Sequence, residues 1–148
     1  MFASPPLLLV VENDPTIGDL LQELLDAEGY AVERAADGQH ALASIQTLAP
    51  DAVLLDVRIP ALDGHQVLDI VRTSELDQRS HLPIILMSGA ATDVERATAL
   101  AAGADGYLAK PFDLDDLLDR VSHLLEQRDL KPNERGILTS ADVETLAH

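Results

Sequence analysis

The chain has no cysteine among its 148 residues, which excludes disulfide bonds, thiolate metal sites and cysteine nucleophiles. Aromatic residues make up only 3% of it, so a core must be built from Leu, Val, Ile and Ala. Basic residues are few as well: 10 Lys and Arg stand against 26 Asp and Glu, for a formal net charge of −16. Nucleic acids and anionic membrane surfaces attract basic stripes, so we expect no direct binding to either.

Long apolar segments are also missing from the sequence. No apolar run approaches the roughly 18 residues of a membrane span, and the N-terminus lacks the basic and apolar regions of a signal peptide. We therefore expect a cytoplasmic protein. The length of the chain and its hydrophobic content of 47% suit one globular α/β domain with a sizeable core.

Short apolar runs alternate along the chain with apolar residues at helical spacing, which is typical of βα units around a parallel sheet. Near-continuous apolar runs predict strands buried on both faces at residues 7–11, 52–56 and 83–88. Residues 30–35 and 105–109 are interpreted as shorter strands, which we place nearer the edges of the sheet.

Five helices are predicted between and after these strands. The first has Asp14 as a candidate N-cap, Pro15 at its first position and Gly29 as its end. The others are expected at residues 38–48, 64–74, 92–102 and 113–127. Five strands and five helices in strict alternation, joined by right-handed crossovers, predict an α/β fold with a doubly wound, flavodoxin-like parallel sheet.

Polar side chains stand where four of the predicted strands end. They are Glu12, Asn13 and Asp14 after the first run, Asp56 in the third, Ser88 in the fourth and Lys110 after the fifth. In an open parallel sheet, ligands bind outside the carboxyl ends of the strands. Carboxylates, an amide, a hydroxyl and a lysine in one crevice suit a divalent cation together with a phosphoryl group, with Asp56 at the centre.

Four segments of the chain resemble the signature segments of the receiver domain of two-component response regulators, in the same order and near the same spacing. They cover residues 10–15, 54–64, 83–89 and 102–112. The resemblance extends over about residues 6–127, and it implies the strand order 2-1-3-4-5. Residues 128–148 fall outside it and are expected to form a linker or a mobile C-terminal tail, with a short helix as the alternative.

The resemblance implies that Asp56 accepts a phosphoryl group from a sensor histidine kinase or a phosphotransfer protein. Ser88 and Lys110 would contact the phosphoryl group. The site would bind Mg²⁺ through Glu12, Asn13, Asp56 and the backbone carbonyl of Arg58. Self-phosphorylation and self-dephosphorylation at Asp56 would then depend on Mg²⁺, without the chain being a conventional enzyme. Asn13 departs from the family, which usually has a second acid there, so weaker Mg²⁺ binding is expected because an amide carries no charge.

The resemblance also implies a switch in which Tyr107 turns inward as Ser88 moves toward the phosphoryl group. The alternative is that Tyr107 is a tyrosine of an edge strand packed on the surface. Pro111 and Gly64 match structural positions of the family. A downstream effector protein or output domain is expected as partner, and a homodimer would use the face made by residues 92–102, 105–109 and 113–127.

Two other functions remain open from the sequence. Asn13 favours a receiver-like domain that is not phosphorylated and serves as a protein-interaction module. An enzyme of flavodoxin or phosphatase type is the third hypothesis, but the chain lacks a glycine-rich phosphate loop and the Asp-x-Asp pattern of aspartyl-phosphate hydrolases.

Overall fold

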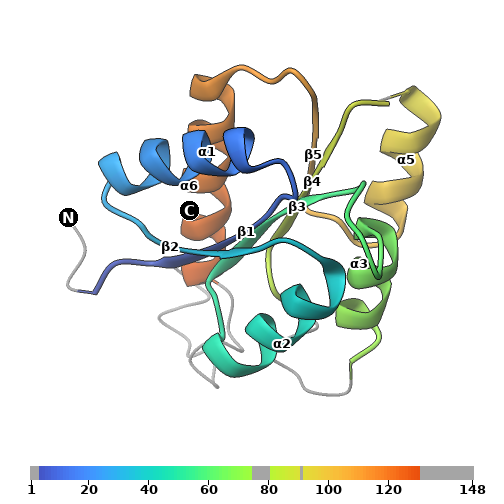
Figure 1. The fold of residues 1–148 in the computed structure, drawn as a ribbon, viewed down its shortest axis with the longest axis horizontal. Helices are drawn as coiled ribbons and strands as arrows, with labels where there is room; N and C mark the ends of the chain where they lie inside the picture. Colours follow the sequence, from blue (N-terminus) through green and yellow to red (C-terminus); the bar gives the residue numbers. More distant parts are fainter. Residues whose placement is uncertain (1–3, 75–80, 91, 131–148) are drawn as a thin grey trace.

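The computed structural model of the chain describes residues 4–74, 81–90 and 92–130. Within these residues, five parallel strands form one sheet in the order β2-β1-β3-β4-β5 (Figure 1). They are β1 (Leu7–Val11), β2 (Ala31–Ala35), β3 (Ala52–Asp56), β4 (Ile84–Ser88) and β5 (Gly106–Ala109). The predicted fold class and strand order are therefore confirmed. The two strands predicted near the edges, β2 and β5, are the edge strands.

The described residues contain five helices, which connect the strands or follow them. They are α1 (Pro15–Ala27), α2 (Gly38–Leu48), α3 (Gly64–Arg72), α5 (Asp93–Ala101) and α6 (Leu114–Leu130). A short polar side chain caps each of the first four by accepting a hydrogen bond from a first-turn amide: Asp14, Asp37, Asp63 and Thr92. The N-cap predicted at Asp14 is therefore confirmed.

The helices cover both faces of the sheet, as Figure 1 shows. Helices α1 and α6 pack on one face, and α2, α3 and α5 pack on the other. Successive residues of a strand point to opposite faces, so Leu8 and Val10 join the first layer while Leu9 and Val11 join the second. This burial on both sides explains why the central strands are continuous apolar runs.

Two aspartates fix the starts of neighbouring strands. The Asp51 backbone N–H donates to the Leu7 carbonyl at 2.7 Å, and the Asp51 carboxylate accepts from the Leu7 N–H at 2.7 Å. Asp105 forms the same reciprocal pair with Ile84, at 2.8 and 2.9 Å, and its carboxylate also accepts from Arg72 of α3. These contacts set the register of β3 on β1 and of β5 on β4, and thereby align the strand ends that carry the polar residues.

Several helix boundaries differ from the prediction: α3 ends at Arg72 instead of residue 74, α5 spans Asp93–Ala101 instead of residues 92–102, and α6 begins at Leu114 instead of Asp113. Helix α6 continues to Leu130, beyond the predicted end at Gln127. Residues 128–130 contain no proline or glycine, so nothing in them interrupts a helix. The rest of the predicted linker or tail, residues 131–148 with its alternative short helix, lies outside the described residues. No helix in the described part of the chain is long and apolar enough to cross a membrane.

Candidate functional site

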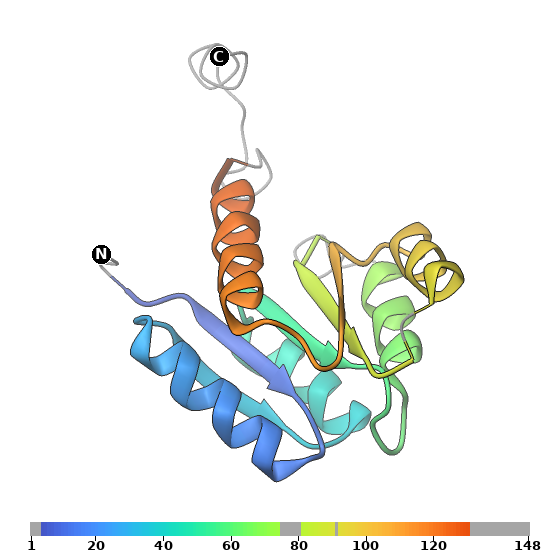
Figure 2. The ribbon, with the colours of Figure 1, turned by 90° about the horizontal axis from the view of Figure 1, so that it is seen from above.

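The carboxyl ends of the strands meet at one edge of the sheet, toward which the arrowheads point in Figure 2. Glu12 directly follows β1, and Lys110 directly follows β5. Asp56 and Ser88 are the last residues of β3 and β4. Because parallel strands end at the same edge, the strand order brings together polar residues that are far apart in the sequence.

Lys110 joins the two carboxylates of this edge. Its Nζ lies 2.7 Å from Oε1 of Glu12 and 2.9 Å from Oδ2 of Asp56. Both acids are buried, with 4% of Glu12 and 5% of Asp56 exposed. A buried charge is costly unless it is paired, so one ammonium that contacts both carboxylates compensates much of their desolvation.

The environment changes the proton affinity of these groups. Burial raises the pKa of Glu12, although the hydrogen bond from Lys110 opposes the change. Burial alone would lower the pKa of Lys110, but its hydrogen bonds to Glu12 and Asp56 outweigh that effect and raise it. Lys110 is therefore a fixed cation at neutral pH, with its charge aimed at Asp56.

The backbone around Asp56 is also closely organised. The N–H of Arg58 donates to Asp56 Oδ1 at 3.1 Å, while the side chain of Arg58 is exposed. Gly64 begins α3 directly beneath, where a Cβ would lie 2.6 Å from the Asp56 carbonyl oxygen. The Lys110–Pro111 peptide bond is cis, and the Lys110 N–H donates to the Ser88 carbonyl at 2.8 Å.

Ser88 places a hydroxyl at the end of β4, next to the strand that carries Asp56. The residue is 1% exposed, and its Oγ accepts a hydrogen bond from the Ala90 N–H at 3.1 Å. Tyr107, on the neighbouring strand β5, lies in the core with 1% of its surface exposed. Its buried position agrees with an inward tyrosine rather than one packed on the surface.

The loop after β1 separates Glu12 from its two neighbours. Asn13 and Asp14 are exposed, and the Asp14 carboxylate caps α1 by accepting from Thr16. The Asp14 backbone N–H donates to Oε2 of Glu12 at 3.1 Å. Nowhere in the described residues do three or more His, Cys, Asp or Glu side chains gather as a metal-binding group.

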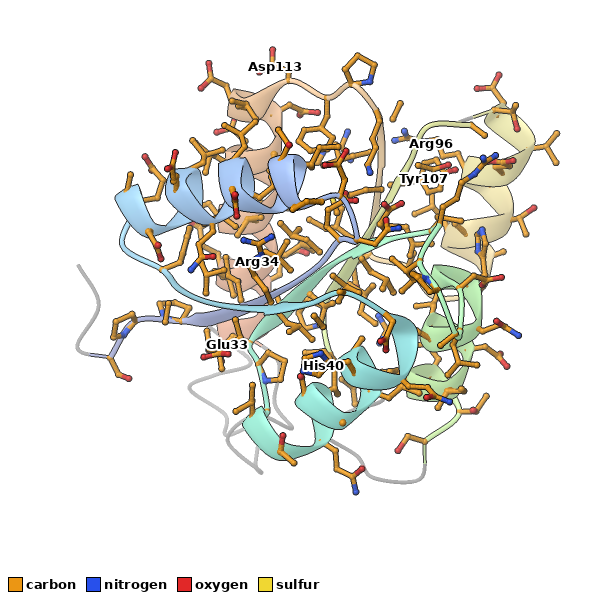
Figure 3. All side chains as sticks on the ribbon, viewed as in Figure 1. Glu33, Arg34, His40, Arg96, Tyr107 and Asp113 are labelled. Carbon is orange, nitrogen blue, oxygen red and sulfur yellow. The ribbon has the colours of Figure 1, made fainter. Side chains whose placement is uncertain are left out.

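The sequence interpretation missed one residue near the site. Glu95, in the first turn of α5, accepts a hydrogen bond from the Tyr107 hydroxyl at 3.0 Å. Its neighbour Arg96 donates to the Tyr107 carbonyl oxygen at 3.4 Å, and Figure 3 shows Arg96 and Tyr107 next to each other between α5 and β5. Nothing in the sequence pattern distinguishes Glu95 from Asp93, the other acid of this helix.

Comparison with known proteins identifies the class of the domain. The sequence model of the response regulator receiver domain family matches residues 8–122 of the chain. The chain is 40% identical over 141 residues to the response regulator MprA of Mycolicibacterium vanbaalenii, covering 94% of this chain and 59% of that protein. It is 36% identical over 124 residues to the transcriptional regulatory protein TrcR of Mycobacterium tuberculosis, covering 84% of this chain and 47% of that protein. The chain thus spans about half the length of these relatives.

Solved structures agree with this assignment. The receiver domain of a Francisella response regulator superimposes with a TM-score of 0.77 at 32% identity, covering 82% of this chain and 98% of that one. The receiver domain of a sensor histidine kinase from Pseudomonas aeruginosa, described with magnesium in its active-site cleft, gives a TM-score of 0.75 at 32% identity. That alignment covers 83% of this chain and 99% of the other. The chain belongs to the response regulator receiver domain family.

Proposed function

We propose that the domain is a phosphoacceptor, in which Asp56 takes a phosphoryl group from the phosphohistidine of a sensor histidine kinase or a phosphotransfer protein. A carboxylate oxygen of Asp56 would attack the phosphorus, and the bond from phosphorus to the donor imidazole would break. The products are an acyl phosphate on Asp56 and the free imidazole of the donor. The observation that carries this proposal is the distance of 2.9 Å between Asp56 Oδ2 and Lys110 Nζ at the carboxyl ends of the strands.

Transfer to a carboxylate must overcome the repulsion between two anions. Catalysis of phosphoryl transfer is mostly positioning and electrostatic stabilisation, and both are available from residues around Asp56. Lys110 supplies a cation that already contacts the attacking carboxylate. Ser88 supplies a hydroxyl at the end of β4. This hydroxyl would donate to a phosphoryl oxygen, and the resulting movement of Ser88 would affect Tyr107.

A Mg²⁺ ion would be held by Glu12, Asp56, the amide oxygen of Asn13 and the backbone carbonyl of Arg58. The donors fit, because two carboxylates with neutral oxygens and water are an ordinary set for this cation. The site offers the cation less negative charge than two free carboxylates would, because Asn13 is neutral and Lys110 already pairs with both Glu12 and Asp56. Such a cation would supply positive charge to the phosphoryl oxygens.

The output of the domain would be a change in partner binding. Its relatives carry about as much chain again beyond the matched part, and one is named a DNA-binding transcriptional regulator. We therefore expect an effector protein or an output domain as partner, and self-association through the face of α5, β5 and α6. The net charge of −16 argues against nucleic-acid binding by this chain itself, and a cytoplasmic location stays part of the proposal.

The proposal is tested by intact-mass measurement after incubation with acetyl phosphate and Mg²⁺. The wild-type chain should gain the mass of one phosphoryl group, and Asp56→Asn should gain none. Asp14→Asn removes a nearby exposed carboxylate that caps α1, so it should still be modified. An adduct of equal amount on Asp56→Asn would contradict the assignment. No adduct on the wild type, with the fold intact, would favour the interaction module without phosphorylation.

A further inference from the structure

The hydroxyl of Tyr107 interacts with two side chains, Ser88 at the end of β4 and Glu95 on α5. It donates to Oε2 of Glu95 at 3.0 Å. Burial, the largest influence, raises the pKa of Tyr107, and a hydrogen bond with Ser88 opposes that change. The phenol thus interacts both with Ser88, which is proposed to contact the phosphoryl group, and with Glu95 on α5.

The backbone of Glu95 is hydrogen-bonded to the N-cap in the first turn of α5. Its backbone N–H donates to the Oγ1 of Thr92, the N-cap residue, at 3.1 Å. Arg96, the next residue, donates from its side chain to the Tyr107 carbonyl oxygen at 3.4 Å. Two consecutive residues of one helix turn therefore bind one tyrosine, the first at its hydroxyl and the second at its backbone carbonyl.

The contact with Glu95 strongly affects the orientation of Tyr107. A buried hydroxyl without a hydrogen-bond partner is costly. Losing such a partner shifts an equilibrium by about fivefold or more. We propose that Glu95 is a positioning residue that holds Tyr107 in its buried orientation, so that the phenol and the first turn of α5 move as one unit.

In this arrangement the expected switch does not need to turn Tyr107 inward, because Tyr107 is already buried. The contacts that bury Tyr107 against α5 come from protein groups, so the inward orientation requires no phosphoryl group. Movement of Ser88 would then shift a tyrosine that is already attached to α5, and the helix would follow. This consequence for signalling rests on the proposed function, whereas the orientation of Tyr107 does not.

The chain offers a direct reporter, because it contains two tyrosines and no tryptophan. In a Tyr30→Phe background Tyr107 is the only tyrosine, and acrylamide quenching of tyrosine emission measures its accessibility in the unmodified protein. Quenching should be weak in this background and severalfold stronger after Glu95→Ala. Glu95→Gln keeps an oxygen acceptor and should stay close to the parent. Asp93→Ala removes another acid from the same helix turn and should leave quenching unchanged.

Thermal unfolding followed by circular dichroism separates this effect from general loosening. Glu95→Gln should restore both protection and cooperative unfolding, even where Glu95→Ala lowers the melting temperature. Equal protection of Tyr107 in the parent and in Glu95→Ala would overturn the proposal, as would equal exposure in Glu95→Ala and Asp93→Ala. Phosphorylation of Asp56 is measured separately by intact mass, so failure of the phosphoacceptor function would leave this result interpretable.

Discussion

Lys110 connects residues that are 98 and 54 positions away in the sequence, Glu12 and Asp56. The three groups carry two negative charges and one positive charge in a largely buried place. Removing one partner from a buried ionic cluster leaves an unpaired charge, which is more destabilising than the cluster itself is stabilising. We therefore expect Lys110 to matter both for the proposed phosphoryl transfer to Asp56 and for the stability of the free domain.

The variant Lys110→Met should be less stable than wild type by about 3 kcal/mol near neutral pH. Burial already raises the pKa of Glu12 above its ordinary value of 4.5, and loss of Lys110 would raise it further. A raised carboxyl pKa in the folded state favours folding at low pH, and this contribution disappears as the pH rises through that pKa. The difference in melting temperature from wild type should thus be smaller at about pH 5 than at about pH 8.

A control for that variant is Arg120→Met, which removes a half-buried cation paired with the exposed Asp116 on α6. A pair in contact with solvent contributes at most about 1 kcal/mol, so its loss should be small at both pH values. A deficit of Lys110→Met that does not change between the two pH values would show that Glu12 stays ionised in that variant.

The variant Asn13→Asp should bind Mg²⁺ more tightly, by about tenfold, because it adds a negative charge near Glu12 and Asp56. Position 13 is exposed, so solvent reduces the gain that a buried pair would have. Without Mg²⁺ the same change should lower the melting temperature through repulsion between carboxylates. Calorimetric titration with Mg²⁺ measures the affinity, and Asn13→Ala, which removes the amide without adding charge, is the control. An unchanged affinity in Asn13→Asp would mean that position 13 does not face the cation.

At the scale of elements, the start of α3 is fitted against the end of β3. Gly64 opens the helix after its N-cap Asp63, and its N–H donates to the Val57 carbonyl at 2.8 Å. A Cβ here would meet the Asp56 carbonyl oxygen at 2.6 Å and the Val57 Cα at 2.8 Å. Both are backbone atoms at the candidate site, so a side chain at position 64 would displace either the helix or the strand end that carries Asp56.

The variant Gly64→Ala should therefore lower the free energy of unfolding by about 1–3 kcal/mol, as overpacking does elsewhere. Phosphorylation by acetyl phosphate should also slow, because the strand end at Asp56 shifts. Gly89→Ala is a matched control: Gly89 is exposed, and a Cβ there has no atom within 4 Å. Chemical denaturation should show a change below about 0.5 kcal/mol for that control. Equal stability of the two variants would show that the backbone at Asp56 yields without cost.

The elements themselves could largely be predicted from the sequence, because their signals are local. Strands β1 and β3 have the predicted bounds, since a strand covered on both faces must be a continuous apolar run. The start of α1 followed from Asp14 and Pro15, which act within one helix turn. The end of α6 was placed too early because the change in composition after residue 127 contains no helix breaker before Pro132.

At the scale of the whole molecule, sequence reasoning predicted which residues gather at one edge but not which side chains touch. The strand order was implied by the resemblance to receiver domains, and this order brings Glu12, Asp56 and Lys110 together at the carboxyl ends of the strands. The reciprocal pairs of Asp51 and Asp105 and the contact of Tyr107 with Glu95 depend on distances between elements. No periodicity in the sequence encodes such distances, so only the folded structure could show them.

The whole molecule carries a large net negative charge, which affects self-association. Two copies with a net charge of −16 each repel one another. Self-association through the face of α5, β5 and α6 should therefore strengthen as salt rises toward about 0.1 M, where screening acts over roughly 10 Å.

Beryllofluoride, which mimics the acyl phosphate on Asp56, should shift the wild type toward the dimer in sedimentation velocity. Ser88→Ala lacks the hydroxyl that we propose links the phosphoryl group to Tyr107, so its dimer fraction should not respond. A response of Ser88→Ala equal to that of the wild type would exclude Ser88 as the link. A wild-type dimer fraction unchanged by beryllofluoride, with the adduct confirmed at Asp56, would show that the output is a partner other than a second copy.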